Sequence, residues 1–196
     1  LTCRKDMGVN STDDLKGKTL GVWFYGNEYP FLSWMSRLGL ATDGSANGVT
    51  VLKQGWGVEP LTEGQAACVS TMSYNEYWVV RDAGYTPEQL TVFKYQAEGA
   101  STLEDGLYVL EKNLGDDSFK DKMVRFVRAS MKGWKYAEAN PKEAASIILD
   151  NDDAGVQTEK HQIRMMGEIA KLTAGSNGSL DPVSYTHLTL PTKLAV

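Results

Sequence analysis

Strand-like and helix-like segments alternate along residues 12–95, and this alternation constrains the fold more than any other feature of the sequence. Short runs of β-branched and apolar residues predict strands, whereas apolar residues at three- and four-residue spacing predict helices. Strands are expected at residues 19–23, 48–54, 66–73 and 89–95, and helices at residues 29–40 and 74–84. Strands that alternate with helices pair in parallel and carry helices on their faces, so the sequence predicts an α/β fold with a parallel-rich sheet.

The character of the sequence changes after residue 103. The segment LYVLEKN, residues 107–113, predicts one more strand. Helices are then expected at residues 116–140, 141–152 and 158–175. The first of them is amphipathic, with one apolar stripe formed by Phe119, Met123, Phe126, Val127, Trp134 and Ala137. Helices with so little strand among them cannot make a doubly wound sheet, so we expect them to pack on a sheet that lies mostly upstream of Leu1.

The two ends of the chain differ from its interior. The end from Val183, VSYTHLTLPTKLAV, has no helical period and follows the turn-rich segment GSNGSLDP. We interpret it as translated adapter or vector sequence and exclude it from the fold. The chain opens at LTCRK in the manner of a strand, without an initiator Met or a signal peptide. We therefore expect an internal fragment of a longer protein.

The tripeptide Asn-Glu-Tyr occurs twice, at residues 27–29 and 75–77, and each copy follows an expected strand among aromatic residues. Ligands of parallel sheets bind beyond the carboxyl ends of the strands. Aromatic rings stack on flat ligands, Asn bonds an amino group and a ring nitrogen together, and a carboxylate accepts from an exocyclic amine. The pattern therefore predicts a site for a small aminated aromatic heterocycle. Its candidate residues are Trp23, Tyr25, Asn27, Glu28, Tyr74, Asn75, Glu76 and Trp78.

A purely structural interpretation of the same residues stays open. Glu28 and Glu76 can be acids of a first helical turn, where the helix dipole favours negative charge. Spacing alone favours this interpretation for both acids. For Trp23 and Trp78, a place in the core and a place in the wall of a ligand site are equally open.

Charge and composition argue against several classes of protein. The formal net charge is −5, and Lys and Arg are spread singly along the chain, so nucleic acid is not expected as a partner. No apolar run approaches the roughly eighteen residues that a membrane span needs.

Cysteine and histidine offer little chemistry in this sequence. Cys3 and Cys68 are too few for a disulfide framework and have no partner at metal-ligand spacing, so we expect two small buried apolar side chains. His161 and His187 lie far from both Asn-Glu-Tyr copies in the sequence. We therefore expect no catalytic residue, no metal and no cofactor.

Several segments together resemble one known family. They are DLKGKTLGVWFYGNEYPFLSWM, MSYNEYW, LEDGLYVLE and MVRFVRASMKGWKYAEANPKEAA. They are similar to the solute-binding proteins of ABC importers of the nitrate, taurine and thiamine-precursor group, which are related to thiamine pyrimidine synthases. The resemblance runs in order from Leu1 to about Pro182. Within it, WFYGNEYPF and YNEYW resemble the branch that binds thiamine pyrimidine precursors.

The resemblance implies a type II periplasmic-binding-protein fold, an α/β fold of two lobes with parallel-rich sheets and a ligand cleft between them. Residues 1–11 would be a hinge strand from lobe one, and residues 12–102 would form lobe two. Residues 103–182 would supply the return hinge and the C-terminal helices of lobe one, followed by the foreign tail at residues 183–196. The N-terminal part of lobe one, with the opposite cleft wall, would then be missing.

The resemblance also implies a function and the roles of some residues. Members of the precursor-binding branch hold a pyrimidine by aromatic stacking and an acidic side chain, and by motif Tyr74 and Glu76 take these roles. Trp23, Asn27 and Glu28 fall on the neighbouring loop. The expected protein is a monomeric extracytoplasmic binding protein, periplasmic or lipid-anchored, that delivers an aminopyrimidine to an ABC permease.

Two alternatives to this function stay open. A thiamine pyrimidine synthase would share the fold, but such enzymes carry a cysteine-rich segment, an active-site His and a cofactor Lys, and this sequence has no Cys cluster. A sulfonate- or nitrate-type binding protein would need cationic or hydroxyl-rich loops, whereas the two motif loops carry acids.

Overall fold

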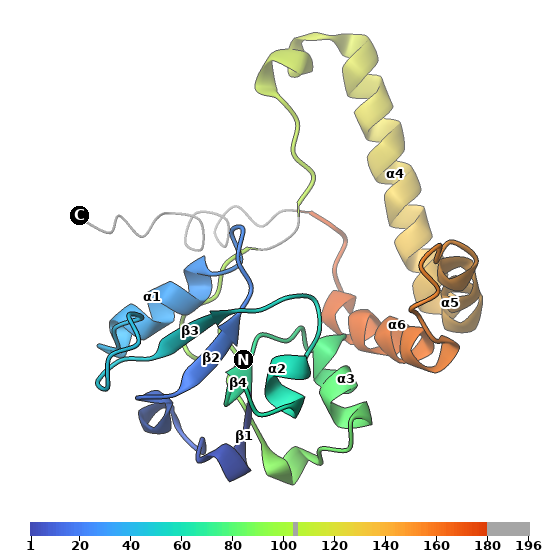
Figure 1. Cartoon of the computed structure of the whole chain (residues 1–196). Coiled ribbons are helices and arrows are strands. Elements are labelled where there is room, and N and C mark those ends of the chain that lie inside the picture. Colours follow the sequence, from blue (N-terminus) through green and yellow to red (C-terminus); the bar gives the residue numbers. More distant parts are fainter. Residues whose placement is uncertain (104–105, 180–196) are drawn as a thin grey trace. The chain divides into compact units, whose positions relative to one another are not determined.

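The computed structural model describes residues 1–103 and 106–179 of the 196-residue chain. The chain divides into two compact units (Figure 1). The described part of the first comprises residues 1–103, and that of the second comprises residues 106–179. The expected foreign tail at residues 183–196 lies outside the described residues.

The first unit is built on one mixed sheet. Its strands are β1 (Thr2–Arg4), β2 (Thr19–Val22), β3 (Thr50–Lys53), β4 (Cys68–Val69) and β5 (Leu90–Val92), in the spatial order β3-β2-β4-β1-β5 (Figure 1). β2 pairs in parallel with β3 and with β4, whereas β1 pairs antiparallel with β4 and with β5. The expected α/β fold is therefore confirmed, but the sheet is mixed, because only β3, β2 and β4 pair in parallel and β1 pairs antiparallel with both of its neighbours.

Helices connect the parallel strands of the first unit much as the alternation predicts. The α-helices are α1 (Tyr29–Arg37), α2 (Glu59–Thr62) and α3 (Glu76–Asp82), and the 3-10 helices are η1 (Lys5–Met7), η2 (Thr12–Leu15) and η3 (Pro87–Gln89). α1 begins with Pro30 in its first turn, where the missing N–H costs nothing. The short helix α2 is not among the expected helices; Pro60 lies in its first turn, and Leu61 is buried.

Apolar residues cover both faces of the sheet. On one face, Phe31 and Trp34 of α1 pack with Leu20 and Cys68 in the larger core. On the other face, Leu61 of α2 and Val80 of α3 pack with Val69 in a second core. Successive residues of a strand point to opposite faces, so the two-residue strand β4 contributes one side chain to each core.

Cys3 and Cys68 form a disulfide between β1 and β4. Both side chains are fully buried, so the sequence expectation is right about burial and wrong about their chemistry, because they are bonded to each other. The two residues face each other in the antiparallel register, and Arg4 N–H donates to Ala67 O beside them at 3.0 Å. Cys3 and Cys68 are thus a non-hydrogen-bonded pair, in which opposed side chains lie closest.

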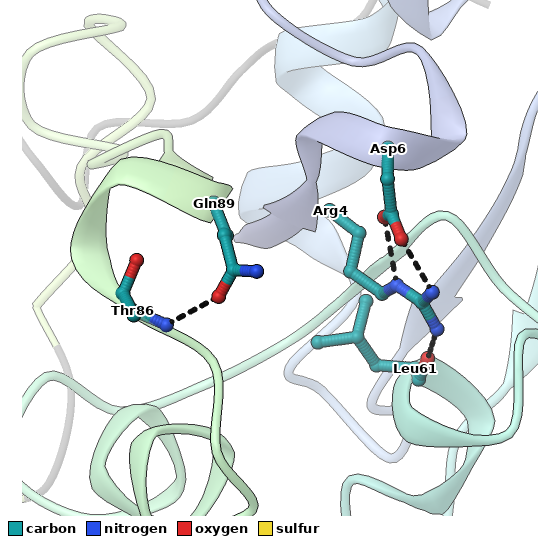
Figure 2. A network of polar contacts seen from close by, with 5 residues as sticks. All are labelled: Arg4, Asp6, Leu61, Thr86 and Gln89. Carbon is teal, nitrogen blue, oxygen red and sulfur yellow. Dashed lines mark hydrogen bonds and ion pairs between the residues drawn. The ribbon is translucent and has the colours of Figure 1, made fainter.

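A polar network lies where β1 ends (Figure 2). The Arg4 guanidinium donates to both carboxylate oxygens of Asp6, at 3.0 and 2.7 Å, and to Leu61 O at 3.0 Å. It also lies over the Tyr85 ring, 5.1 Å from the centroid. The hydrogen bonds from Arg4 hold the pKa of Asp6 below its usual value. One side chain therefore connects β1, η1 and α2.

The described part of the second unit is helical. It contains η4 (Glu111–Gly115), α4 (Asp117–Ala139), α5 (Pro141–Asp150) and α6 (Glu159–Thr173), so the three expected helices are confirmed. The expected strand at residues 107–113 is wrong, because η4 begins at Glu111 and no strand occurs within residues 106–179 for this segment to pair with. None of the described residues of α4 is fully buried, and Phe126, Val127 and Trp134 of its apolar stripe are exposed. No helix in the described part of the chain is both long and apolar enough to span a membrane.

Replacing both Cys3 and Cys68 by Ala should lower the free energy of unfolding by about 4 kcal/mol. The disulfide joins residues 65 apart in the sequence, and a crosslink of that span removes much chain entropy from the unfolded state. Urea unfolding of the oxidised protein and of the double variant measures the difference. Dithiothreitol should destabilise only the wild-type chain; equal sensitivity of the two proteins would contradict a disulfide contribution.

Asp6→Asn should lower the melting temperature slightly at neutral pH and not at all in acid. Because the pKa of Asp6 is lowered on folding, its ionised form stabilises the protein above the unfolded-state pKa of about 3.9, and this stability is lost as the pH falls towards the folded-state pKa. The contribution stays below about 1 kcal/mol, since the Asp6 side chain is 64% exposed. Melting curves between about pH 7 and pH 3 test this. A difference that persists unchanged in acid would show that another contact of Asp6 matters.

Candidate functional site

The two Asn-Glu-Tyr loops leave the sheet from adjacent strand ends. β2 and β4 are parallel neighbours in the register Leu20 opposite Cys68 and Gly21 opposite Val69. The chain goes from β2 to β3 on one side, whereas β4 lies on the other side of β2, so this is the point where the strand order reverses. Ligands of open α/β sheets bind beyond the carboxyl ends of strands at such a point. Residues 23–28 and 70–75 follow these two strand ends.

Three candidate residues of the first loop use their polar atoms to shape it. Trp23 Nε1 donates to Gly55 O at 3.1 Å, in the loop that follows β3. Asn27 Nδ2 donates to Phe24 O at 3.2 Å, and Glu28 Oε2 accepts from the Gly26 backbone N–H at 2.8 Å. These contacts give each of the three a local structural role, and a direct role in binding a ligand stays a prediction.

Tyr25 has the least ordinary conformation of the first loop. Its φ of 66° lies in the left-handed region, which non-glycine residues adopt rarely and which is enriched at functional sites. Its side chain is 90% exposed. The Lys53 ammonium donates to the Tyr25 hydroxyl at 2.9 Å and lies 4.3 Å from the ring centroid. This hydrogen bond lowers the pKa of the Tyr25 phenol.

The second loop is closed by Glu76, the first residue of α3. One carboxylate oxygen accepts from the Met72 backbone N–H at 2.8 Å, and the other accepts from Asn75 Nδ2 at 2.7 Å. Trp78 packs edge-on against Tyr77, with ring centroids 5.4 Å apart. Tyr74, Asn75 and Trp78 are half-buried. Glu76 thus fits the interpretation as an acid of the first helical turn. Its hydrogen bonds to Met72 and Asn75 leave acceptor sites on the carboxylate, so they do not exclude a ligand.

The structure adds a buried residue that the sequence analysis missed. Gln54 follows β3, is 6% exposed, and its side chain crosses to β4, where its amide accepts from Ser70 N at 2.8 Å and donates to Ser70 O at 3.0 Å. It also donates to Gly57 O at 3.2 Å. Gly21 of β2 leaves room for this crossing, since a Cβ there would meet Val69 Cγ1 at 2.9 Å and Gln54 Oε1 at 3.2 Å. One amide therefore fixes the ends of β3 and β4 on either side of β2.

Two further residues at the end of β3 were also missed. Lys53 places a positive charge beside the first loop, whose own residues 23–28 include one acidic residue and no basic residue. Trp56 is 97% exposed and stands between two glycines. The signal for Trp56 was available, because the tripeptide Gly-Trp-Gly directly follows an expected strand. No sequence signal pairs Lys53 with Tyr25, because 28 residues separate them.

The described residues contain no cluster of three or more His, Cys, Asp or Glu side chains that could hold a metal ion. His161 lies on α6 of the second unit, and His187 lies outside the described residues. The strand ends described above instead offer aromatic rings, two carboxylates and one ammonium group. Such a set can stack on a planar molecule and accept hydrogen bonds from its amino groups.

Gly21→Ala should destabilise the first unit by about 1–3 kcal/mol, because the new methyl group overpacks the space between Val69 and Gln54. Gly55→Ala is the matched control, since a Cβ there meets nothing within 4 Å. Urea unfolding of both variants gives the comparison. Equal stability of Gly21→Ala and the wild-type chain would show that the Gln54 crossing adapts without cost.

Comparisons with known proteins agree with the motifs. Residues 1–144 match the family described as NMT1/THI5 like, which is well over half of the chain. No curated protein matches the chain. The family match confirms the resemblance to the nitrate, taurine and thiamine-precursor binding proteins. The chain belongs to the NMT1/THI5-like family.

Proposed function

We propose that this protein is the extracytoplasmic solute-binding component of an ABC importer and captures an aminopyrimidine precursor of thiamine. Membership of the NMT1/THI5-like family supports a solute-binding or a THI5-like role. The observation that carries the choice of site is the parallel pairing of β2 with β4, which starts both Asn-Glu-Tyr loops from adjacent strand ends. Two carboxylates and several aromatic rings then border one edge of the sheet.

The chemistry of these loops suits an aminated planar ligand. A carboxylate has about four acceptor sites, so Glu76 can accept from a ligand amine as well as from Met72 and Asn75. Stacking on an aromatic side chain contributes about 1–3 kcal/mol per base. Two stacked rings and two or three hydrogen bonds would suffice for micromolar binding, about −8 kcal/mol.

The disulfide supports an extracytoplasmic location. Disulfides persist in oxidising compartments such as the periplasm and are rare in the cytosol. The bond between Cys3 and Cys68 is fully buried, as expected of a disulfide that stabilises the fold. In the proposed function the protein works as a monomer, closes two lobes on the ligand and delivers it to a membrane permease.

Lys53 is the observation that favours a second ligand class. A sulfonate- or nitrate-type binding protein needs a cation near its ligand, and the Lys53 ammonium lies beside Tyr25 of the first loop. Two carboxylates on the same loops argue against an anionic ligand, since like charges repel it. The aminopyrimidine therefore remains the proposed ligand, with taurine and nitrate as the comparison.

Direct ligand titration tests the proposed function. Nuclear magnetic resonance detects weak as well as tight binding, so the chain is titrated with hydroxymethyl-aminopyrimidine, taurine and nitrate in turn. The aminopyrimidine should shift signals of residues 23–28 and 70–78 and be recovered unchanged. Binding of taurine or nitrate alone would change the ligand class. Formation or consumption of the pyrimidine would establish a THI5-like enzyme instead.

Glu76→Gln should weaken aminopyrimidine binding about tenfold or more, because a hydrogen bond to a charged group contributes about 1.5–3 kcal/mol. The fold should tolerate the change, since a Gln side-chain oxygen can still accept from Met72 N–H. Glu63→Gln is the control, because Glu63 is an exposed acid after α2 whose carboxylate accepts a hydrogen bond from Gln65 Nε2 at 2.8 Å. Equal affinities of Glu76→Gln and Glu63→Gln would restrict Glu76 to its role in the helix turn.

A further inference from the structure

Trp56 presents an almost fully exposed indole on a loop that is itself held in place. The side chain is 97% exposed. A single exposed apolar residue is common on protein surfaces and does not by itself define a site. The backbone around Trp56 supplies the independent evidence.

The carbonyl groups on both sides of Trp56 accept hydrogen bonds from two side chains, Trp23 after β2 and Gln54 after β3. Gly55 O accepts from Trp23 Nε1 at 3.1 Å, and Trp23 belongs to the first Asn-Glu-Tyr loop. Gly57 O accepts from Gln54 Nε2 at 3.2 Å, and the same amide is bonded to Ser70, where the second loop begins. The loop that carries Trp56 is therefore tied to both loops of the proposed site.

This arrangement differs from that of a mobile surface residue. Gln54 is buried, and breaking its hydrogen bonds would leave a buried amide without partners, which costs free energy. The position of the Trp56 backbone is thus fixed by the same contacts that fix the ends of β3 and β4. A fixed backbone removes the cost of ordering the loop when a ligand binds, so only the rotamers of the indole remain to be ordered.

We propose that Trp56 is a ligand-contacting residue, a third aromatic side chain that stacks on the planar ligand of the two Asn-Glu-Tyr loops. This inference rests on the proposed function and extends it to the loop after β3. The end of β3 is next to that of β2, with Val22 opposite Lys53, so Trp56 follows directly beside the first loop. Trp23 and Gln54 act as positioning residues, because they hold the carbonyl groups that flank Trp56.

The five tryptophans of the chain provide a direct test. Each indole N–H gives its own nuclear magnetic resonance signal, and substitution of each residue assigns it. Titration of the chain with hydroxymethyl-aminopyrimidine should shift the signal of Trp56. The signals of Trp34, buried in the core, and of Trp134, on α4 of the second unit, should stay in place.

Affinity measurements on variants complete the test. Trp56→Ala should weaken binding about tenfold or more, the expected loss of one stacked ring, and Trp56→Phe should restore most of the affinity. Trp134→Ala is the matched control, an exposed tryptophan on α4 of the second unit, and should bind like the wild-type chain. Unchanged melting temperatures would show that the fold is intact.

The outcomes separate this inference from the proposed function. Tight binding by both the wild-type chain and Trp56→Ala, with a stationary Trp56 signal, would overturn the role of Trp56 and leave the proposed function in place. Normal ligand affinity with lost permease-dependent uptake would also overturn it and assign Trp56 to permease docking. If no tryptophan signal of the wild-type chain responds to the aminopyrimidine, both proposals fail.

Discussion

The buried amide of Gln54 is the interaction on which the arrangement of the strand ends depends. A side-chain amide removed from water must keep its hydrogen bonds, and Gln54 satisfies this requirement by bonding both backbone groups of Ser70 and the carbonyl of Gly57. Its path crosses β2 at Gly21, the residue without a side chain. The loop after β3 and the second Asn-Glu-Tyr loop are consequently fixed to each other. The first Asn-Glu-Tyr loop joins them through a separate bond, from Trp23 Nε1 to Gly55 O.

The short strand β4 is held from both sides by different means. On the side of β2 it has a parallel ladder and the Gln54 amide, whereas on the side of β1 it has an antiparallel ladder and the disulfide. Such support compensates for its length, because a strand of two residues offers few backbone hydrogen bonds. The second Asn-Glu-Tyr loop, which follows β4, therefore starts from a well-fixed point. The proposed binding residues gain their positions from this support.

The two glutamates show how structural and binding roles can coexist. Glu28 and Glu76 each accept a backbone N–H of the loop that precedes their helix, so each shapes its own loop. A carboxylate retains further acceptor sites after such bonds, so a local role does not exclude a ligand. Lys53 adds a positive charge beside Tyr25. The edge of the sheet therefore offers both signs of charge among aromatic rings.

The sequence alone determined the elements whose signals are local. Periodicity and a proline in the first turn placed α1, and the same kind of signal placed α4, α5 and α6, because such preferences act within a few residues. Tertiary structure decided what depends on distant partners. Residues 107–113 are apolar enough for a strand but have no strand to pair with among residues 106–179, the described part of their unit. β1 is inserted in reverse between β4 and β5, and Cys3 bonds Cys68. Lys53, Gln54 and Trp56 lie beside the Asn-Glu-Tyr loops for the same reason, since strand pairing brings the end of β3 next to that of β2, whose other neighbour is β4.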